Sequence, residues 1–163
     1  MKKNSGLTLA ELLVIIVVIG LILTITITSI SGLLKETKHN IKETEMKTVY
    51  EGCKSYLSDV VEGDKSYKFN GVDKSGYAFL KQLVEACNIP RMCEVTEADG
   101  VYTAKLFVPM TLFKEYVEAD KFNTGNCSTE ATIKISKNSY GYYELNSITV
   151  DKDTNVKADT CVK

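Results

Sequence analysis

The chain has 163 residues, enough for one domain and a membrane anchor. Its 20 basic and 21 acidic residues give a net charge of −1, so it lacks the basic surplus that binding of nucleic acid requires. The even balance hides an uneven layout, because residues 7–34 hold almost all of the long aliphatic runs and the remainder is polar and mixed.

A short basic leader precedes the apolar stretch. Lys2 and Lys3 favour a cytoplasmic N-terminus. A conventional secretory signal has an apolar run of about 7–15 residues, whereas this one continues to Leu34. As a helix, residues 12–34 would extend roughly 34 Å, enough to cross a bilayer. Composition alone therefore favours a signal anchor with an extracytoplasmic domain.

One carboxylate, Glu11, lies near the start of this stretch, and no further charge follows until Lys35. A charged side chain inside a bilayer costs at least about 2.5–3.5 kcal/mol on insertion scales, and one found there usually has a partner. The sequence offers Glu11 no partner within reach, apart from the chain's own N-terminus after processing. We therefore expect the partner of Glu11 in an assembly.

The N-terminal segment has a distinctive set of residues: Lys2, Lys3, Gly6, residues 7–9, residues 11–14 and Gly20. In this set it resembles the type IV pilin family, which includes the pseudopilins of type II secretion systems and the pilin-like proteins of DNA-uptake machines. The resemblance covers residues 1–34.

The resemblance implies that a prepilin peptidase cuts between Gly6 and Leu7 on the cytoplasmic side and that the new N-terminus, Leu7, is methylated. It also implies that Glu11 pairs with the amino terminus of a neighbouring subunit during filament assembly. The sequence departs from the family pattern at three positions. Leu7 replaces the usual phenylalanine, Ala10 stands where a larger aliphatic residue is common, and Thr28 stands where many pilins have a helix-bending proline.

From this resemblance we expect a cleaved leader at residues 1–6, a hydrophobic transmembrane and assembly helix at 7–34, and an extracytoplasmic head at 35–163. The chain would be a structural subunit, first held in the cytoplasmic membrane by a single pass and then assembled into a type IV pilus (fimbrium) or related surface filament. Its partners would be other pilin subunits, prepilin peptidase, the membrane assembly platform with its motor, and lipid. Major pilin, minor pilin and secretion pseudopilin all remain open.

The alternative function is a signal-anchored extracytoplasmic binding or adhesion domain that acts singly. An anchored enzyme is disfavoured, because the sequence has no Ser/His/Asp elbow, P-loop or glycine-rich phosphate loop. We expect no cofactor. The only histidine, His39, lies in a charged segment and is interpreted as a solvated side chain.

Beyond the apolar stretch, apolar residues recur at close to a helical period. They predict one helix over residues 7–61, roughly 80 Å long, that ends at Gly63 and Asp64. The residues expected to face the core of the head are Val49, Cys53, Leu57 and Val60.

The sequence of the rest of the head predicts several short strands and two helices. We expect strands at 67–69, 101–108, 131–136, 140–150 and 156–162, a helix at 77–87, and a short helix capped by Thr111 and reaching Glu118. The predicted fold class is α+β and type IV pilin-like: a long N-terminal helix packed on a small antiparallel sheet.

All five cysteines follow the apolar stretch and would lie outside the cytoplasm, where disulfides persist. Their spacings do not fit zinc patterns. We expect Cys127 to pair with Cys161 and Cys87 with Cys93, which would leave Cys53 as a buried free thiol, although other pairings stay open.

Two further patterns have plain structural interpretations. Residues 151–155 resemble the start of a calcium loop, but Val156 and Val162 stand where the loop needs glycine and glutamate, so a polar turn is favoured and calcium binding stays open. Tyr140, Tyr142 and Tyr143 are interpreted as packing on a half-buried sheet.

Overall fold

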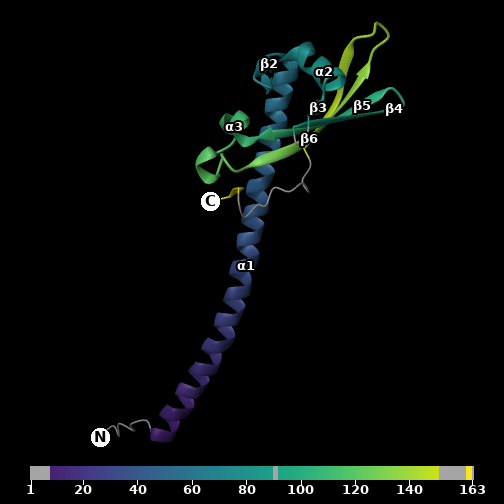
Figure 1. Cartoon of the computed structure of the whole chain (residues 1–163). Coiled ribbons are helices and arrows are strands. Elements are labelled where there is room, and N and C mark those ends of the chain that lie inside the picture. Colours follow the sequence, from purple (N-terminus) through teal and green to yellow (C-terminus); the bar gives the residue numbers. More distant parts are fainter. Residues whose placement is uncertain (1–7, 90–91, 151–160, 163) are drawn as a thin grey trace. The chain divides into compact units, whose positions relative to one another are not determined.

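A computed structural model of the chain describes residues 8–89, 92–150, 161 and 162, with only the backbone described for residues 23–32 (Figure 1). Helix α1, Leu9–Glu62, has 54 residues, in agreement with the single long helix predicted from the sequence. The chain divides into two structural units, Met1–Ile41 and Lys42–Lys163, and α1 contributes residues to both. Within the described residues, we find no helical stretch with the length and hydropathy that a membrane span needs.

In the second unit, one side of α1 is buried in the head. Met46, Val49, Cys53, Leu57 and Val60 recur every three or four residues and are at most 4% exposed. This spacing places them on one face of the helix, where they form a continuous apolar seam. The prediction that Val49, Cys53, Leu57 and Val60 face the core is confirmed.

Helix α1 ends at a glycine, as the sequence predicts. Gly63 has a φ of +100°, a conformation that is open to glycine because it lacks a Cβ. The carbonyl oxygen of Asp59 accepts hydrogen bonds from the amides of Gly63, Asp64 and Lys65 at 2.9–3.2 Å. These bonds satisfy a carbonyl that has no partner further along the helix.

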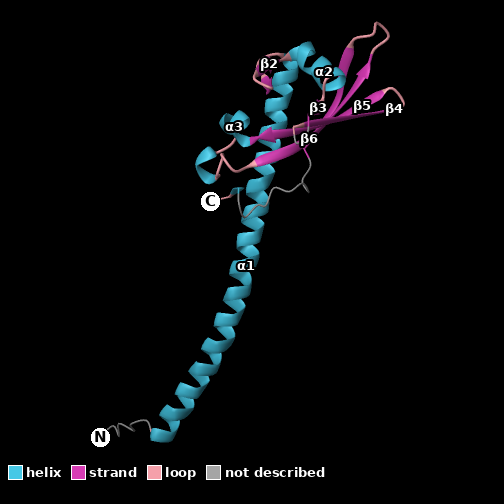
Figure 2. Cartoon of the chain, viewed as in Figure 1, coloured by secondary structure: helices cyan, strands magenta, loops and turns pink. Residues whose placement is uncertain are grey.

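The head contains a five-stranded sheet in which each strand pairs antiparallel with the next along the chain (Figure 2). Its order is β3-β4-β5-β6-β7. The strands are β3 Asn88–Ile89, β4 Cys93–Ala98, β5 Val101–Pro109, β6 Ser128–Lys137 and β7 Tyr143–Val150.

The two faces of this sheet differ. On β5, buried Ala104, Leu106 and Val108 alternate with exposed Lys105 and Phe107. The register places these buried residues opposite buried residues of β6, so both strands present one apolar face. Helix α1 packs on that face. The contact includes a hydrogen bond from Thr129 Oγ1 to Cys53 Sγ at 3.0 Å.

Smaller elements close the ends of this core. The hairpin of β1 (Tyr67–Phe69) and β2 (Val72–Lys74) places Tyr67 and Phe69 against Phe79 of helix α2 (Gly76–Glu85), with ring centroids 4.7–6.0 Å apart. After β5 come the short helix α3 (Met110–Phe113) and the 3-10 turns η1 (Lys114–Tyr116) and η2 (Ala119–Lys121).

Several sequence predictions for the head are wrong in detail. Strands β2, β3 and β4 were not predicted. Thr111 does not cap a helix, because α3 begins at Met110 with Pro109 at its N-cap and already passes into a 3-10 turn at Lys114. Strand β7 begins at Tyr143 rather than at 140, since Asn138 and the residues after it form the turn. The strand predicted at 156–162 lies mostly outside the described residues; Val162 forms an isolated bridge with Phe122.

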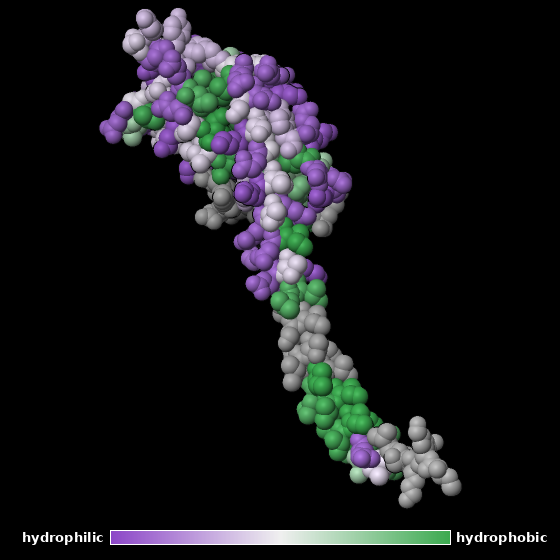
Figure 3. Space-filling view, turned by 180° about the vertical axis from the view of Figure 1, so that it is seen from behind, coloured by the Kyte–Doolittle hydropathy of each residue, from purple (hydrophilic) through white to green (hydrophobic). Residues whose placement is uncertain are grey.

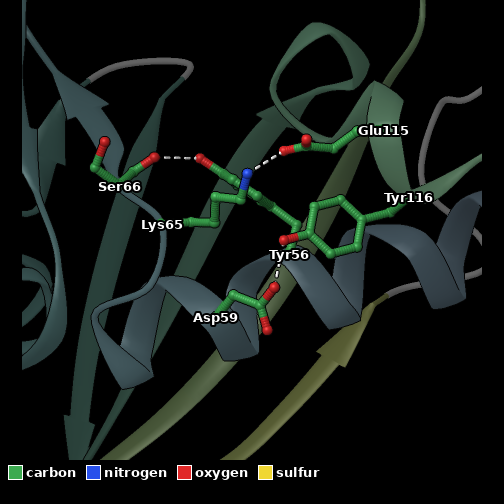
Figure 4. Close-up of polar contacts among 6 residues, drawn as sticks. All are labelled: Tyr56, Asp59, Lys65, Ser66, Glu115 and Tyr116. Carbon is green, nitrogen blue, oxygen red and sulfur yellow. Dashed lines mark hydrogen bonds and ion pairs between the residues drawn. The ribbon is translucent and has the colours of Figure 1, made fainter.

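A group of polar contacts fastens the C-terminal end of α1 to η1 (Figure 4). The Tyr116 hydroxyl donates a short hydrogen bond to Asp59 Oδ2, and the Lys65 ammonium contacts Glu115 Oε1 at 2.5 Å. The Tyr56 hydroxyl donates to the carbonyl oxygen of Ser66 at 2.6 Å. The bond to the Asp59 carboxylate raises the pKa of Tyr116 from 10.0 to about 12, so this hydroxyl keeps its proton further into the alkaline range than an ordinary tyrosine does.

Where these polar contacts join η1 to α1, the residues at the end of η1 lie very close to Gly52. A Cβ at this position would lie 2.6 Å from Val117 Cγ1 and 3.1 Å from the carbonyl oxygen of Tyr116. We therefore expect Gly52→Ala to destabilise the head. Overpacking costs about 1–3 kcal/mol, and the better helix propensity of alanine returns about 1 kcal/mol. The net loss in unfolding free energy, on the order of 1 kcal/mol, is measurable by urea unfolding of the full chain in detergent.

A double-mutant cycle provides the control. Val117→Ala removes the closest atom, so Gly52→Ala should cost less in that background than in the wild type. Equal costs in the two backgrounds would show that contact with Val117 does not explain the need for glycine.

Candidate functional site

The N-terminal part of α1 is apolar on every side and has no covering within its own unit. From Leu12 to Ile22, each large aliphatic side chain is 46–61% exposed, and Leu9 is 85% exposed. Figure 3 shows one face of this segment covered by hydrophobic side chains. A helix that is hydrophobic all round normally lies in a core or in a bilayer. Among the described residues, this segment therefore presents an apolar surface that is largely exposed.

Glu11 lies at the start of this apolar segment and closes a capping box with Thr8. One carboxylate oxygen, Oε2, accepts hydrogen bonds from the Thr8 amide and from Thr8 Oγ1, both at 2.8 Å. In return, the Glu11 amide donates to Thr8 Oγ1 at 3.3 Å. This reciprocal arrangement satisfies amides at the N-terminus of a helix.

The capping box corrects the expectation that the chain offers Glu11 no partner. Thr8 is the partner that the sequence analysis missed, although the Thr-x-x-Glu spacing of residues 8–11 is its signature. Thr8 supplies hydrogen bonds but no positive charge. These contacts therefore leave the negative charge of Glu11 uncompensated.

The surface beside Glu11 has room for another group. Ala10, Glu11, Val14 and Ile15 line an open depression of about 450 Å³. The small side chain of Ala10, noted in the sequence as a departure from the pilin pattern, contributes to this space. The other two residues of the predicted processing and assembly site, Gly6 and Leu7, lie outside the described residues. No protein-family model matches the chain, and neither the curated proteins nor the solved structures include a similar one.

In the head, four of the five cysteines form two disulfides, Cys87–Cys93 and Cys127–Cys161. These are the pairs expected from the sequence. The first joins the segment after α2 to the start of β4 across six positions. The second joins Cys161, near the end of the chain, to the residue before β6 across 34 positions. Long closures of this kind restrict the unfolded chain most.

Cys53 is free and buried, at 0% exposure. Burial raises the pKa of its thiol from an ordinary 9.0 to about 11, and the hydrogen bond from Thr129 opposes that rise in part. A thiol that stays protonated near neutral pH is a poor nucleophile and a poor metal ligand. Cys53 is therefore a packing residue.

Other candidates offer no reactive site. Among the described residues, no group of histidine, cysteine, aspartate and glutamate side chains is arranged to hold a metal ion. Residues 151–155 of the calcium-like loop lie outside the described residues. The interpretation of three tyrosines as packing residues holds for Tyr143, which is 7% exposed, but it is wrong for Tyr140 and Tyr142, which are 85% and 60% exposed.

The buried thiol of Cys53 should make the head less stable at alkaline pH. Because the folded-state pKa lies above the ordinary one, the stabilisation is fully present below pH 9 and is lost as the pH rises towards 11. We expect the wild type to lose about 2–3 kcal/mol more unfolding free energy than Cys53→Ala across this interval, since one pKa unit corresponds to about 1.4 kcal/mol. Urea unfolding at each pH measures the difference.

Thiol counting gives an independent control. Iodoacetamide at pH 8 should leave the native chain unlabelled and should add one label after unfolding in guanidinium. A native chain that is labelled quickly would contradict the burial of Cys53 in solution.

Proposed function

We propose that the chain is a type IV pilin or pilin-like subunit, made as a precursor, held in the membrane and then assembled into an extracytoplasmic filament. The observation that carries the proposal is the bare apolar surface of α1 from Leu9 to Ile22, with a single carboxylate, Glu11, at its start. The α+β head, with α1 packed on an antiparallel sheet, is compatible with the finer pilin-like fold, which is part of this proposal.

The apolar surface is consistent with both proposed states of the subunit, the precursor in the membrane and the subunit in the filament. Burial of an exposed Leu, Ile or Val side chain contributes about 1.5–3 kcal/mol, so covering the half-exposed side chains of residues 12–22 would contribute on the order of 10 kcal/mol. Lipid provides that covering before assembly, and the corresponding helices of neighbouring subunits provide it afterwards. A subunit that acts singly in water would leave this surface bare.

The negative charge of Glu11, to which Thr8 contributes no cation, supports a specific contact in the filament. A carboxylate in an apolar interior needs a cation placed beside it. Cleavage after Gly6 would create an α-amino group on Leu7, and the depression beside Glu11 offers room for that group from a neighbour. One subunit's terminus would then satisfy the next subunit's carboxylate, and the contact would repeat along a helical filament.

The two disulfides support an extracytoplasmic head, because the cytosol keeps thiols reduced. Prepilin peptidase, the assembly platform and its motor belong to the proposal as the partners that such a subunit needs.

One observation favours a second candidate, a signal-anchored domain that acts singly. The capping box with Thr8 gives Glu11 a local role at the helix start, which requires no neighbour. In that case the identity of Glu11 as an anion would matter little.

Processing is tested on the native protein. We expect mass spectrometry to find a mature chain that begins at Leu7 and carries one methyl group on its amino terminus. A chain that keeps Met1 in its native cell envelope would contradict the proposal.

The substitution Glu11→Gln separates the two roles of Glu11. Glutamine keeps a side-chain oxygen that can accept from Thr8, so the helix cap survives, but it removes the charge. We expect at least a tenfold loss of incorporation into sheared surface filaments, while the membrane-bound pool is unchanged; tenfold corresponds to about 1.4 kcal/mol. Quantitative immunoblots of the two fractions measure this.

Thr8→Ala is the matched control. It removes the capping hydroxyl and keeps the carboxylate, so incorporation should change far less than with Glu11→Gln. If Glu11→Gln assembled like the wild type, charge pairing would be wrong. If the wild-type chain itself were missing from the sheared filaments, the single-acting domain would be favoured.

A further inference from the structure

Four tyrosines contact one another where the β6–β7 hairpin meets α2, and a fifth lies in the hairpin turn, the region of the yellow-green hairpin of Figure 1. The ring of Tyr77 lies 5.8 Å from that of Tyr142 and 6.1 Å from that of Tyr143, between centroids. Tyr102 on β5 meets Tyr143 edge-on at 6.0 Å. Tyr140 lies two residues before Tyr142 in the same turn. We call these five residues the tyrosine platform.

The exposed fraction of the side chains increases across the platform, from Tyr143 to Tyr140. Tyr143 is 7% exposed and forms its base, where its hydroxyl donates to Glu85 Oε1 at 3.3 Å. Tyr77 is 45% exposed, Tyr142 60% and Tyr140 85%. The outer rings therefore add little to the core of the head, and their apolar faces are available to a ligand.

Asn138 holds the exposed tyrosines in place. Its side-chain oxygen accepts hydrogen bonds from the amides of Tyr140 and Tyr142, both at 3.0 Å. Its side-chain nitrogen donates to Glu144 Oε1 at 2.8 Å, and Gly141 turns the chain with a φ of +84°. The backbone of the turn is thus fixed before any ligand binds, which lowers the entropy lost on binding.

The charges around the platform argue against a polyanion. Glu97 lies opposite Tyr102 across the β4–β5 pair, and Glu85 and Glu144 bind platform or turn residues. The nearby lysines are engaged: Lys137 lies over the Tyr143 ring at 5.1 Å, and Lys81 lies 3.8 Å from Glu85. Nucleic acid binds chiefly through lysine and arginine contacts to phosphates, and the carboxylates of Glu85, Glu97 and Glu144 beside the platform would repel a phosphate.

We infer that the tyrosine platform binds a neutral carbohydrate. A pyranose ring presents C–H groups on one face, and these are attracted to the electron-rich face of an aromatic ring. Its hydroxyl groups suit the phenols and carboxylates at the edge of the platform. This site goes beyond the proposed assembly role and does not depend on it, because every residue involved lies in the head.

The test is a titration of the full chain with cellohexaose, chitohexaose and maltohexaose, in a detergent without a sugar headgroup. The chain contains no tryptophan, so tyrosine dominates its fluorescence, and five of its nine tyrosines belong to the platform. We expect saturable binding of at least one oligosaccharide. Tyr140→Ala with Tyr142→Ala should weaken it about tenfold, because the two most exposed ring faces of the platform are lost. Tyr142→Phe should stay within about threefold, because the ring face remains.

Phe107→Ala is the matched control, since Phe107 is 45% exposed on the opposite face of the sheet and should leave binding unchanged. The absence of saturable binding to all three oligosaccharides, or binding that survives loss of Tyr140 and Tyr142, would overturn the inference. It would also be overturned if the platform tyrosines instead governed binding of a deoxythymidine dodecamer, or self-association in sedimentation.

Discussion

Burial of the apolar seam of α1 against the inner face of the five-stranded sheet is the contact on which the head depends. The seam supplies Met46, Val49, Cys53, Leu57 and Val60, and β5 and β6 supply the facing residues. Neither element is stable alone, because an isolated sheet would expose one apolar face and the helix one apolar stripe. The hairpin of β1 and β2, helix α2 and the turns after β5 then close the edges of this two-layer core.

The two halves of α1 meet different demands with one secondary structure. In its second half, apolar residues recur with a helical period, and the polar residues between them face solvent. From Leu12 to Ile22, apolar residues fill every position of the helix except Gly20. The periodic apolar face of the second half packs on one partner, the sheet of the head. The apolar residues on all sides of the first half need an apolar environment all round, and in the proposed function this is lipid before assembly and neighbouring helices afterwards.

The parts of the fold with strong periodicity were predictable from the sequence, and the parts set by tertiary pairing were not. Helix α1, its core face and its end at Gly63 follow from spacing and from one glycine. Strand β4 was not predicted because Glu94 and Glu97, three positions apart, break the alternation of apolar and polar residues, and its pairing with β5 makes it a strand. Thr111 looked like a helix cap, but Pro109 already ends β5 and begins the next turn. At the candidate site, the position of Glu11 was predictable from the residue type, whereas its hydrogen bonds with Thr8 were not predicted, although the Thr-x-x-Glu spacing is typical of a capping box.

The odd cysteine has a consequence for how the chain matures. Exchange between thiols and disulfides begins with attack by a thiolate, so a molecule with one accessible thiol can keep reshuffling its own bridges or capture those of its neighbours. In the folded head, the only cysteine outside the two disulfides sits at 0% exposure with a raised pKa. Once the seam of α1 is packed, the Cys53 thiol is buried and can no longer attack the two disulfides. A molecule that pairs Cys53 with another cysteine would have to fit that bridge into the seam, at a position that is 0% exposed.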